Sequence, residues 1–168
     1  SLLVEDRTGQ VVASFGDVVG EKLRLADLPP YVPQAAVAIE DRRFWSHPGI
    51  DPLGIARAAM VDLLHHRVAQ GGSTITQQVA KTLFLSNART WRRKGQELLL
   101  TMWLEWHFTK EEILEIYLNQ VYMGSGAWGI DGAARMYFGI SARQLHLWQA
   151  AVLAGLPRAP SRFNPRQR

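Results

Sequence analysis

The spacing of hydrophobic positions changes from strand-like to helical along this chain. Residues 2–16, LLVEDRTGQVVASFG, predict two short strands around a turn at residues 6–9. Polar, proline-containing sequence then runs to Pro30, and beyond it the apolar residues mostly follow the 3.6-residue period of amphipathic helices. We therefore expect a mainly α single domain over residues 1–168, with a small β element at its N-terminus.

Two helices are indicated by residues 31–66. The segment YVPQAAVAIED predicts a short helix that ends near Glu40 and Asp41. Asp51, followed by Pro52, has the capping residue and first-turn proline of a helix start. That helix runs toward His66, and its apolar residues share one face: Leu53, Ala56, Met60, Leu63 and Leu64.

Further helix starts are marked by pairs of residues with the spacing of a capping box. These pairs are Thr74 with Gln77, Thr109 with Glu112, and Ser141 with Gln144. A fourth helix, residues 91–108, is apolar nearly all round in its second half, which predicts a buried central helix. Residues 124–129 predict a loop, and the proline-rich end of the chain predicts an extended strap.

Composition narrows the class of protein without choosing a function. A chain of 168 residues with 47% hydrophobic content can bury the core of one domain. Its 19 Lys and Arg against 15 Asp and Glu give a net charge of +4, which mildly favours phosphates, nucleic acid or an acidic membrane surface. The absence of cysteine excludes disulfides and thiolate metal sites. No apolar run reaches the length of a membrane span.

The most unusual segment is QGGSTITQQVAK, residues 70–81, which is rich in uncharged polar groups and ends in one cation. Ser73 follows two glycines at a helix start, where free backbone N–H groups and the helix dipole attract an anion. Gln77 and Gln78 lie within one turn of Lys81. This arrangement suits sugar hydroxyls and a phosphate. The alternative is an ordinary helix cap followed by a solvated face.

The next helix start concentrates charge. Arg89, Arg93 and Glu97 are spaced by four residues, and Lys94 precedes Glu97 by three. Three cations beside one carboxylate would form a cradle for a diphosphate. The alternative is a surface Arg–Glu pair that stabilises the helix by about 0.3 kcal/mol.

A third candidate lies in AIEDRRFWSHPGID, residues 38–51. Glu40 and Asp41 follow an apolar helix and precede Phe44, an environment that suits an acid/base catalyst. The alternative is an exposed helix end with its charges in water. His47, before a proline, is expected to be a turn residue with local hydrogen bonds.

Five segments together resemble, in order, the motifs of the family 51 peptidoglycan glycosyltransferases. These are the glycan-polymerising domains of class A penicillin-binding proteins and of monofunctional transglycosylases. The match covers residues 31–165 as the motif-bearing catalytic region and leaves residues 1–30 as N-terminal strands and linker. The segments are EDRRFWSHPGID (40–51), GGSTITQQVAK (71–81), RKGQE (93–97), KEEILEIYLNQVYMGSGAWGI (110–130) and AAVLAGLPRAPSRFNP (150–165).

This resemblance implies a bilobal fold with a lysozyme-like head and a smaller, membrane-proximal jaw. It implies polymerisation of lipid II into glycan strands, with inversion at MurNAc C1 and release of polyprenyl diphosphate. It places the catalytic domain on the periplasmic face of the bacterial inner membrane, held by an N-terminal helix that this sequence lacks. The implied partners are lipid II, the growing glycan chain, the membrane surface, an attached transpeptidase domain and other cell-wall synthesis proteins, with no nucleic acid.

The resemblance also implies roles for individual residues. Glu40 would be the general base on the GlcNAc 4-hydroxyl. Glu97 would lie at the leaving diphosphate, directly or through a divalent cation, Mg or Mn, with no organic cofactor. Lys81, Arg89, Arg93 and Lys94 would stabilise the diphosphate. The remaining substrate-binding candidates are Asp41, Phe44, Arg57, Ser73, Thr74, Gln77 and Gln78.

Three other functions remain open from the residues alone. A glycan-cleaving lysozyme-like or lytic enzyme would use Glu40 as a general acid, but it has no diphosphate for the basic residues to hold. A non-catalytic glycan- or lipid-binding module would need no base. A nucleic-acid binder agrees poorly with cations that are few and lie beside carboxylates.

Overall fold

The chain is known from a computed structural model. The structure describes residues 2–5, 11–15, 17–65, 73–84, 88 and 90–157. The described helices are α1 (Tyr31–Glu40), α2 (Pro52–His65), α3 (Ile75–Thr82), α4 (Trp91–His107), α5 (Lys110–Gln120), α6 (Gly129–Phe138) and α7 (Leu147–Gly155). The strands are β1 (Leu2–Glu5), β2 (Val11–Phe15), β3 (Val18–Val19) and β4 (Ala127–Trp128), and short 3₁₀ turns span Leu25–Asp27 and Ala142–Gln144. The expected mainly α fold with a small N-terminal β element is confirmed.

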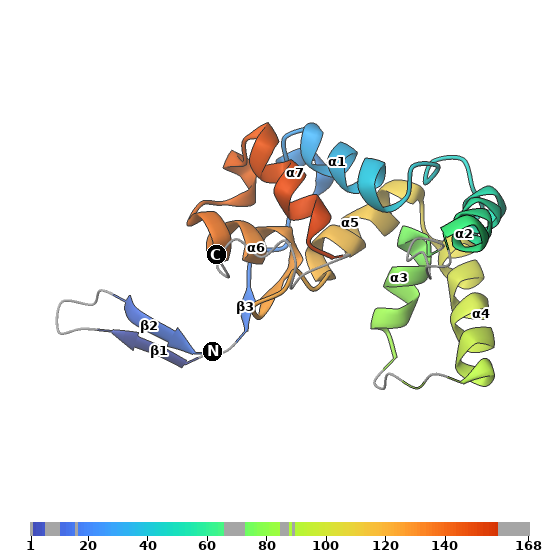
Figure 1. Cartoon of the computed structure of the whole chain (residues 1–168). Coiled ribbons are helices and arrows are strands. Elements are labelled where there is room, and N and C mark those ends of the chain that lie inside the picture. The colour runs from blue at the N-terminus through green and yellow to red at the C-terminus, as the bar shows by residue number, and fades with distance from the viewer. Residues whose placement is uncertain are drawn as a thin grey trace.

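The helices form two groups, which we call the large lobe (α1, α5, α6 and α7) and the small lobe (α2, α3 and α4) (Figure 1). In the large lobe α1 packs against α7, and α5 packs against α6. Helix α3 packs against both α4 and α5, so it joins the two lobes. Most of the buried hydrophobic side chains belong to the large lobe and to the face of α3 that meets it. This arrangement agrees with the expected head and jaw.

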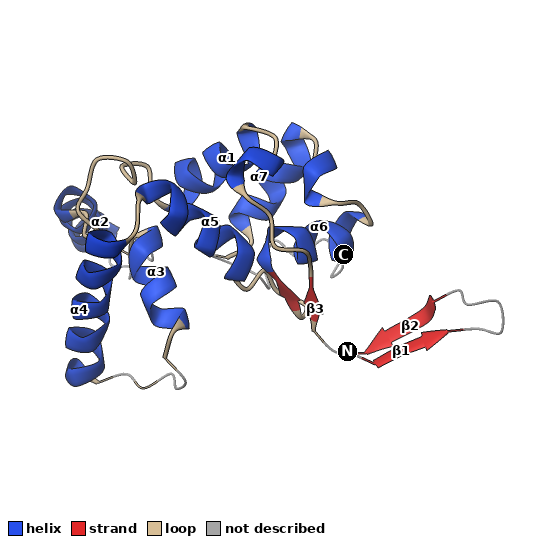
Figure 2. Cartoon of the chain, turned by 180° about the vertical axis from the view of Figure 1, so that it is seen from behind, coloured by secondary structure: helices blue, strands red, loops and turns tan. Residues whose placement is uncertain are grey.

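The N-terminal strands form two separate pairs. Strands β1 and β2 are antiparallel and project from the helical body as a hairpin (Figure 2). Strand β3 instead pairs in parallel with β4 and so belongs to the large lobe. The predicted turn at residues 6–9 lies outside the described residues.

The segment after β3 is held closely against the large lobe. A Cβ atom at Gly20 would lie 2.4 Å from the backbone nitrogen of Gly132 on α6, so only glycine allows this approach. The Asn119 amide on α5 accepts from the Leu23 backbone N–H at 2.9 Å and donates to the Leu23 carbonyl at 2.8 Å. Residues 20–23 are therefore packed into the large lobe, and Leu23 is buried in its core.

Helix α4 differs from the prediction of a buried central helix. Of its described side chains, only Thr101 and Leu104 are buried, while Trp91 is 92% and Trp106 is 87% exposed. The apolar residues of α2 are also exposed, among them Leu53, Met60, Leu63 and Leu64. The reason is that α4 lies at the edge of the small lobe, where α3 is the main element packed against it.

Two smaller expectations also need correction. Ser141 caps the 3₁₀ turn Ala142–Gln144 through the Arg143 N–H, and the capping box that starts α7 is formed by His146 and Gln149. The predicted loop at residues 124–129 contains strand β4 and the first residue of α6.

No helix in the described part of the chain is both long and apolar enough to cross a membrane. Residues 158–165 of the predicted strap lie outside the described residues.

Candidate active site

Glu40 lies at the junction of the two lobes. It is the last residue of α1 and shares a buried face with Val32, Ala36 and Val37, because these positions are three or four residues apart. Its side chain is only 5% exposed, so the alternative of a solvated helix end is wrong. The Gln78 side chain on α3 donates from Nε2 to Glu40 Oε2 at 3.3 Å. Glu40 and Gln78, which the sequence analysis singled out separately, are therefore brought together.

The neighbouring Asp41 is engaged by the protein itself. Its Oδ2 atom accepts the backbone N–H of Ile75, the first residue of α3, at 3.0 Å. The same oxygen lies 2.7 Å from Nε2 of His47, and both side chains are buried. A carboxylate at a helix N-terminus also interacts favourably with the helix dipole. Asp41 therefore fixes the start of α3 against the end of α1.

Several side-chain contacts hold the loop between α1 and α2 in place. Phe44 is fully buried and packs edge-on against Trp45 and His47. Arg43 pairs with Asp51 at 2.6 Å, and this guanidinium holds the pKa of the Asp51 carboxyl below its ordinary value. Asp51 Oδ1 also accepts the Gly54 N–H at 3.1 Å, which confirms it as the cap of α2.

Helix α3 presents its polar residues in two different ways. Thr74 and Gln77 form the predicted capping box, so the Gln77 side chain accepts the Thr74 N–H at 2.9 Å. The Thr74 hydroxyl, in turn, donates to the Gly49 carbonyl at 2.6 Å. Gln78 is half-buried beside Glu40, and Lys81 is exposed in the last turn. Ser73 is half-buried, and the two glycines before it lie outside the described residues.

The start of α4 gathers the basic residues near the end of α3. The Arg93 guanidinium lies 4.1 Å from the centre of the ring of Phe84, the second residue after α3. Since Lys81 is in the last turn of α3, this contact places Lys81, Arg93 and the exposed Lys94 at the same end of the two packed helices. Glu97 follows one turn further along α4 and is half-buried. Arg89 lies outside the described residues.

The structure divides the sequence-predicted site residues into two groups. Asp41, Phe44 and Thr74 are buried and contact other parts of the protein. Glu40 and Gln78 meet at the junction of the lobes, and Ser73 precedes α3. Lys81, Arg93 and Lys94 lie where α3 ends and α4 begins, and Glu97 lies one turn further along α4. Arg57 is exposed on α2. Within the described part of the chain, no group of three His, Asp or Glu side chains could hold a metal ion.

Lys110 and Glu105, which the sequence analysis did not single out as site residues, are connected to Asp41 through His47. Lys110, the first residue of α5, is near His47 and pairs with Glu105 of α4. The available sequence signal was a cation in the first turn of a helix, where the dipole favours acidic residues. That signal is weak, because many helix starts carry such a residue on the surface.

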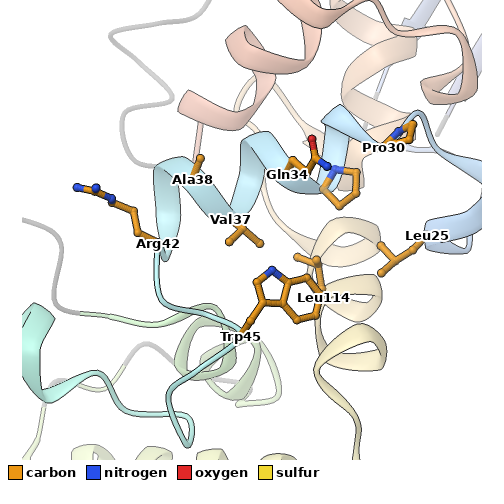
Figure 3. A pocket seen from close by; sticks show the side chains of 9 residues that line it. Leu25, Pro30, Gln34, Val37, Ala38, Arg42, Trp45 and Leu114 are labelled. Carbon is orange, nitrogen blue, oxygen red and sulfur yellow. The ribbon is translucent and has the colours of Figure 1, made fainter.

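A groove of about 540 Å³ lies on another face of α1. Figure 3 shows Arg42 toward one end, Leu25 and Pro30 toward the other, and the Trp45 ring between them beside Leu114. Its walls are mainly apolar and do not include Glu40. The groove is therefore separate from the candidate active site.

The chain is similar in sequence to known proteins over nearly its whole length. The family model described as transglycosylase matches residues 8–168. The chain is 48% identical to penicillin-binding protein 1A of Aquifex aeolicus over 162 residues, which is 96% of this chain and 22% of that relative. It is 48% identical to penicillin-binding protein 1A of Escherichia coli K12 over 157 residues, 94% of this chain and 18% of that relative. The protein of the same name from Neisseria gonorrhoeae is 43% identical over 164 residues, 98% of this chain and 21% of that relative. The chain thus spans about a fifth of the length of these relatives.

Proposed function

The chain belongs to the transglycosylase family, and we propose that it polymerises lipid II into peptidoglycan glycan strands, with Glu40 as the general base. The observation that carries this proposal is the placement of a buried carboxylate, Glu40, beside the Gln78 amide at the junction of the lobes. A general base needs to be held within hydrogen-bond reach of the proton it removes. A carboxylate anchored between two packed elements meets that requirement better than one on a mobile surface.

In the proposed reaction Glu40 takes the proton from the 4-hydroxyl of a GlcNAc sugar. The freed oxygen attacks C1 of MurNAc on the growing chain from the face opposite the leaving group, so the configuration at C1 is inverted. The bond from C1 to the diphosphate oxygen breaks, and its electron pair leaves with the polyprenyl diphosphate. Lys81, Arg93 and Lys94, gathered at one end of α3 and α4, would stabilise the negative charge on that leaving group.

Glu97 suits a supporting role at the diphosphate. A divalent cation such as Mg or Mn is usually held by one or two carboxylates together with substrate phosphates. Glu97 could supply such a carboxylate at the diphosphate. The cation, when bound, would neutralise charge on the diphosphate. Glu97 would then orient the leaving group without taking up a proton.

The proposal extends to where the domain works. Lipid II is an amphiphile, so the enzyme that uses it has to work at a membrane surface. The exposed apolar side chains of α2 and α4 suit that location. We place the domain on the periplasmic face of the bacterial inner membrane. The growing glycan chain, a transpeptidase domain and other cell-wall synthesis proteins are the expected partners.

The substitution Glu40→Gln tests the mechanism directly. Glutamine keeps the shape of the side chain and can still contact Gln78, but it cannot take up a proton. Turnover of lipid II should fall by about 10²–10⁴-fold, while binding of lipid II is retained. The measurement is polymer length and released polyprenyl diphosphate from labelled lipid II, with binding assayed separately. Glu111→Gln, at an exposed position in the first turn of α5, is the matched control and should turn over normally.

The same assay separates the alternative functions. A lytic enzyme would shorten existing glycan strands and release no polyprenyl diphosphate from lipid II. A binding module would retain lipid II without converting it. A folded Glu40→Gln protein with near wild-type turnover would contradict the assigned role of Glu40.

A further inference from the structure

A chain of partly buried polar contacts leads from His47, the partner of Asp41, to Lys110 and Glu105. Lys110 Nζ donates to Glu105 Oε1 at 2.7 Å and lies 3.4 Å from His47 Nδ1. The same Glu105 oxygen accepts the Thr76 hydroxyl at 2.6 Å. Lys110 and Glu105 therefore connect three structural elements, because Thr76 belongs to α3, Glu105 to α4 and Lys110 to α5.

These contacts determine which nitrogen of His47 carries the proton. The Gly49 N–H donates to His47 Nδ1 at 3.0 Å, and the Lys110 ammonium faces the same nitrogen. Nδ1 is therefore an acceptor, since an ammonium group has only donors to offer. The proton then resides on Nε2, which donates to Asp41 Oδ2 at 2.7 Å. Lys110 thus favours the tautomer that Asp41 requires.

The position of Lys110 is not explained by helix stability. It is the first residue of α5, where the positive end of the helix dipole disfavours a cation. Its side chain is 18% exposed and that of Glu105 is 14% exposed, so both have lost most of their hydration. The gain from a buried ion pair often does not exceed its desolvation penalty, so such a pair is weak evidence for a stabilising role.

We infer that Lys110 and Glu105 are positioning residues for the general base. They fix the orientation of His47, which holds Asp41, and Asp41 fixes the first turn of α3 beside Glu40. Glu105 also holds α3 directly through Thr76. Asp41 and Glu105 therefore both hold the first turn of α3. The Gln78 side chain, one turn further along α3, contacts Glu40. This inference rests on the proposed role of Glu40.

The substitution Lys110→Met tests it, because methionine fills similar space without a charge or a donor. The expected result is a fall in kcat of roughly 10–100-fold, comparable to the loss when a residue that orients a metal ligand through a hydrogen bond is removed, with little change in KM for lipid II. Lys110→Arg, which keeps the charge and donors, should recover part of kcat. Lys22→Met, at an exposed position outside the site, is the control and should leave both constants unchanged.

Two further measurements separate a positioning role from a structural one. In a Glu40→Gln background, Lys110→Met should not lower the residual rate further, because residues that act through one another are not additive. In ¹⁵N NMR of histidine-labelled protein, the unprotonated Nδ1 signal of His47 should weaken in Lys110→Met, as the two tautomers mix. If Lys110→Met does not fold, Glu105→Gln takes its place in both experiments.

Normal kcat in folded Lys110→Met would overturn the inference. An equal rate loss in the wild-type and Glu40→Gln backgrounds would overturn it as well. Failure of the proposed function has a different outcome, because Glu40→Gln itself would then keep its turnover.

Discussion

Asp131 shows how a single buried carboxylate ties distant parts of this chain together. It lies in the first turn of α6 and accepts the backbone N–H of Glu21 at 2.7 Å and that of Ala142 at 2.9 Å. Arg135 donates to it at 2.8 Å. Burial raises the pKa of Asp131. The hydrogen bonds from the Ala142 N–H, Arg135 and the Glu21 N–H lower the pKa by more than burial raises it. The net pKa lies below the ordinary value of 3.8.

This arrangement predicts a pH-dependent contribution to stability. A carboxyl with a lowered pKa in the folded protein stabilises the fold above its unfolded pKa, and that contribution is lost as the pH falls through the folded pKa. Asp131→Asn should therefore lower the free energy of unfolding by about 1.5–3 kcal/mol near neutral pH. The difference from wild type should shrink as the pH falls below about 4. Urea denaturation across this range measures both. A difference that stays constant at low pH would contradict the assignment.

At the residue scale, the sequence could nominate acidic and polar candidates but not assign their partners. Glu40 and Asp41 are adjacent, yet Glu40 contacts Gln78 of α3, whereas Asp41 is committed to His47 and the Ile75 N–H. Which partner each carboxylate contacts depends on where the chain turns after α1. It also depends on how the fold brings Ile75, 34 residues later in the sequence, next to Asp41. Hydrophobic spacing carries no information about either.

At the element scale, Gly20 and Gly132 allow a very close approach between the segment after β3 and α6. A methyl group at Gly20 would lie 2.4 Å from the Gly132 nitrogen and 2.6 Å from the Asp131 carbonyl carbon, and both are backbone atoms that cannot rotate away. Gly20→Ala should therefore lower the free energy of unfolding by about 1–3 kcal/mol, as overpacking usually does. Thermal or urea unfolding followed by circular dichroism measures the change.

The matched control is Gly95→Ala in the second turn of α4. A Cβ atom there would meet nothing within 4 Å, so alanine should stabilise the helix by about 0.5–1 kcal/mol. Opposite signs for the two substitutions support the packing argument. Equal stability of Gly20→Ala and wild type would mean that the segment after β3 can shift away from α6.

Capping chemistry made most helix starts predictable, because it depends on residues a few positions apart. Thr74, Thr109 and Asp51 all cap the helices expected of them. The parallel pairing of β3 with β4 was not predicted, since its partners are separated by more than a hundred residues. Helix α4 was predicted as buried because an apolar helix surface looks the same in sequence whether or not other parts of the protein cover it.

At the scale of the whole molecule, the exposed apolar residues are concentrated on the small lobe. Helices α2 and α4 carry most of the large hydrophobic side chains that are exposed in the described part of the chain. Arg92 and Lys94 lie beside Trp91 at the start of α4 and are also exposed. Apolar and basic groups on one surface suit the interface of a membrane with anionic lipids. We therefore expect the domain to bind anionic liposomes at low salt.

Trp106→Gln provides a sharper form of this prediction. The substitution should weaken partitioning into anionic liposomes by roughly tenfold, since about 1.4 kcal/mol of lost apolar burial corresponds to that factor. Trp148→Gln, at an exposed position on the large lobe, should leave partitioning unchanged. Flotation of the three proteins on a density gradient measures the bound fraction. Wild-type protein that stays at the bottom of the gradient would exclude the membrane surface proposed for the small lobe.

The exposure of aromatic residues has a consequence for how this protein can be observed. All six tryptophans of the chain are substantially exposed, from 38% for Trp128 to 92% for Trp91. Their indole rings already contact water in the folded state, so their fluorescence emission should lie at long wavelength and change little when the chain unfolds. Transfer of Trp91, Trp103 and Trp106 from water to lipid would instead shift the emission to shorter wavelength. The intrinsic fluorescence of this domain is thus a sensitive reporter of what covers its surface and a poor reporter of whether it is folded.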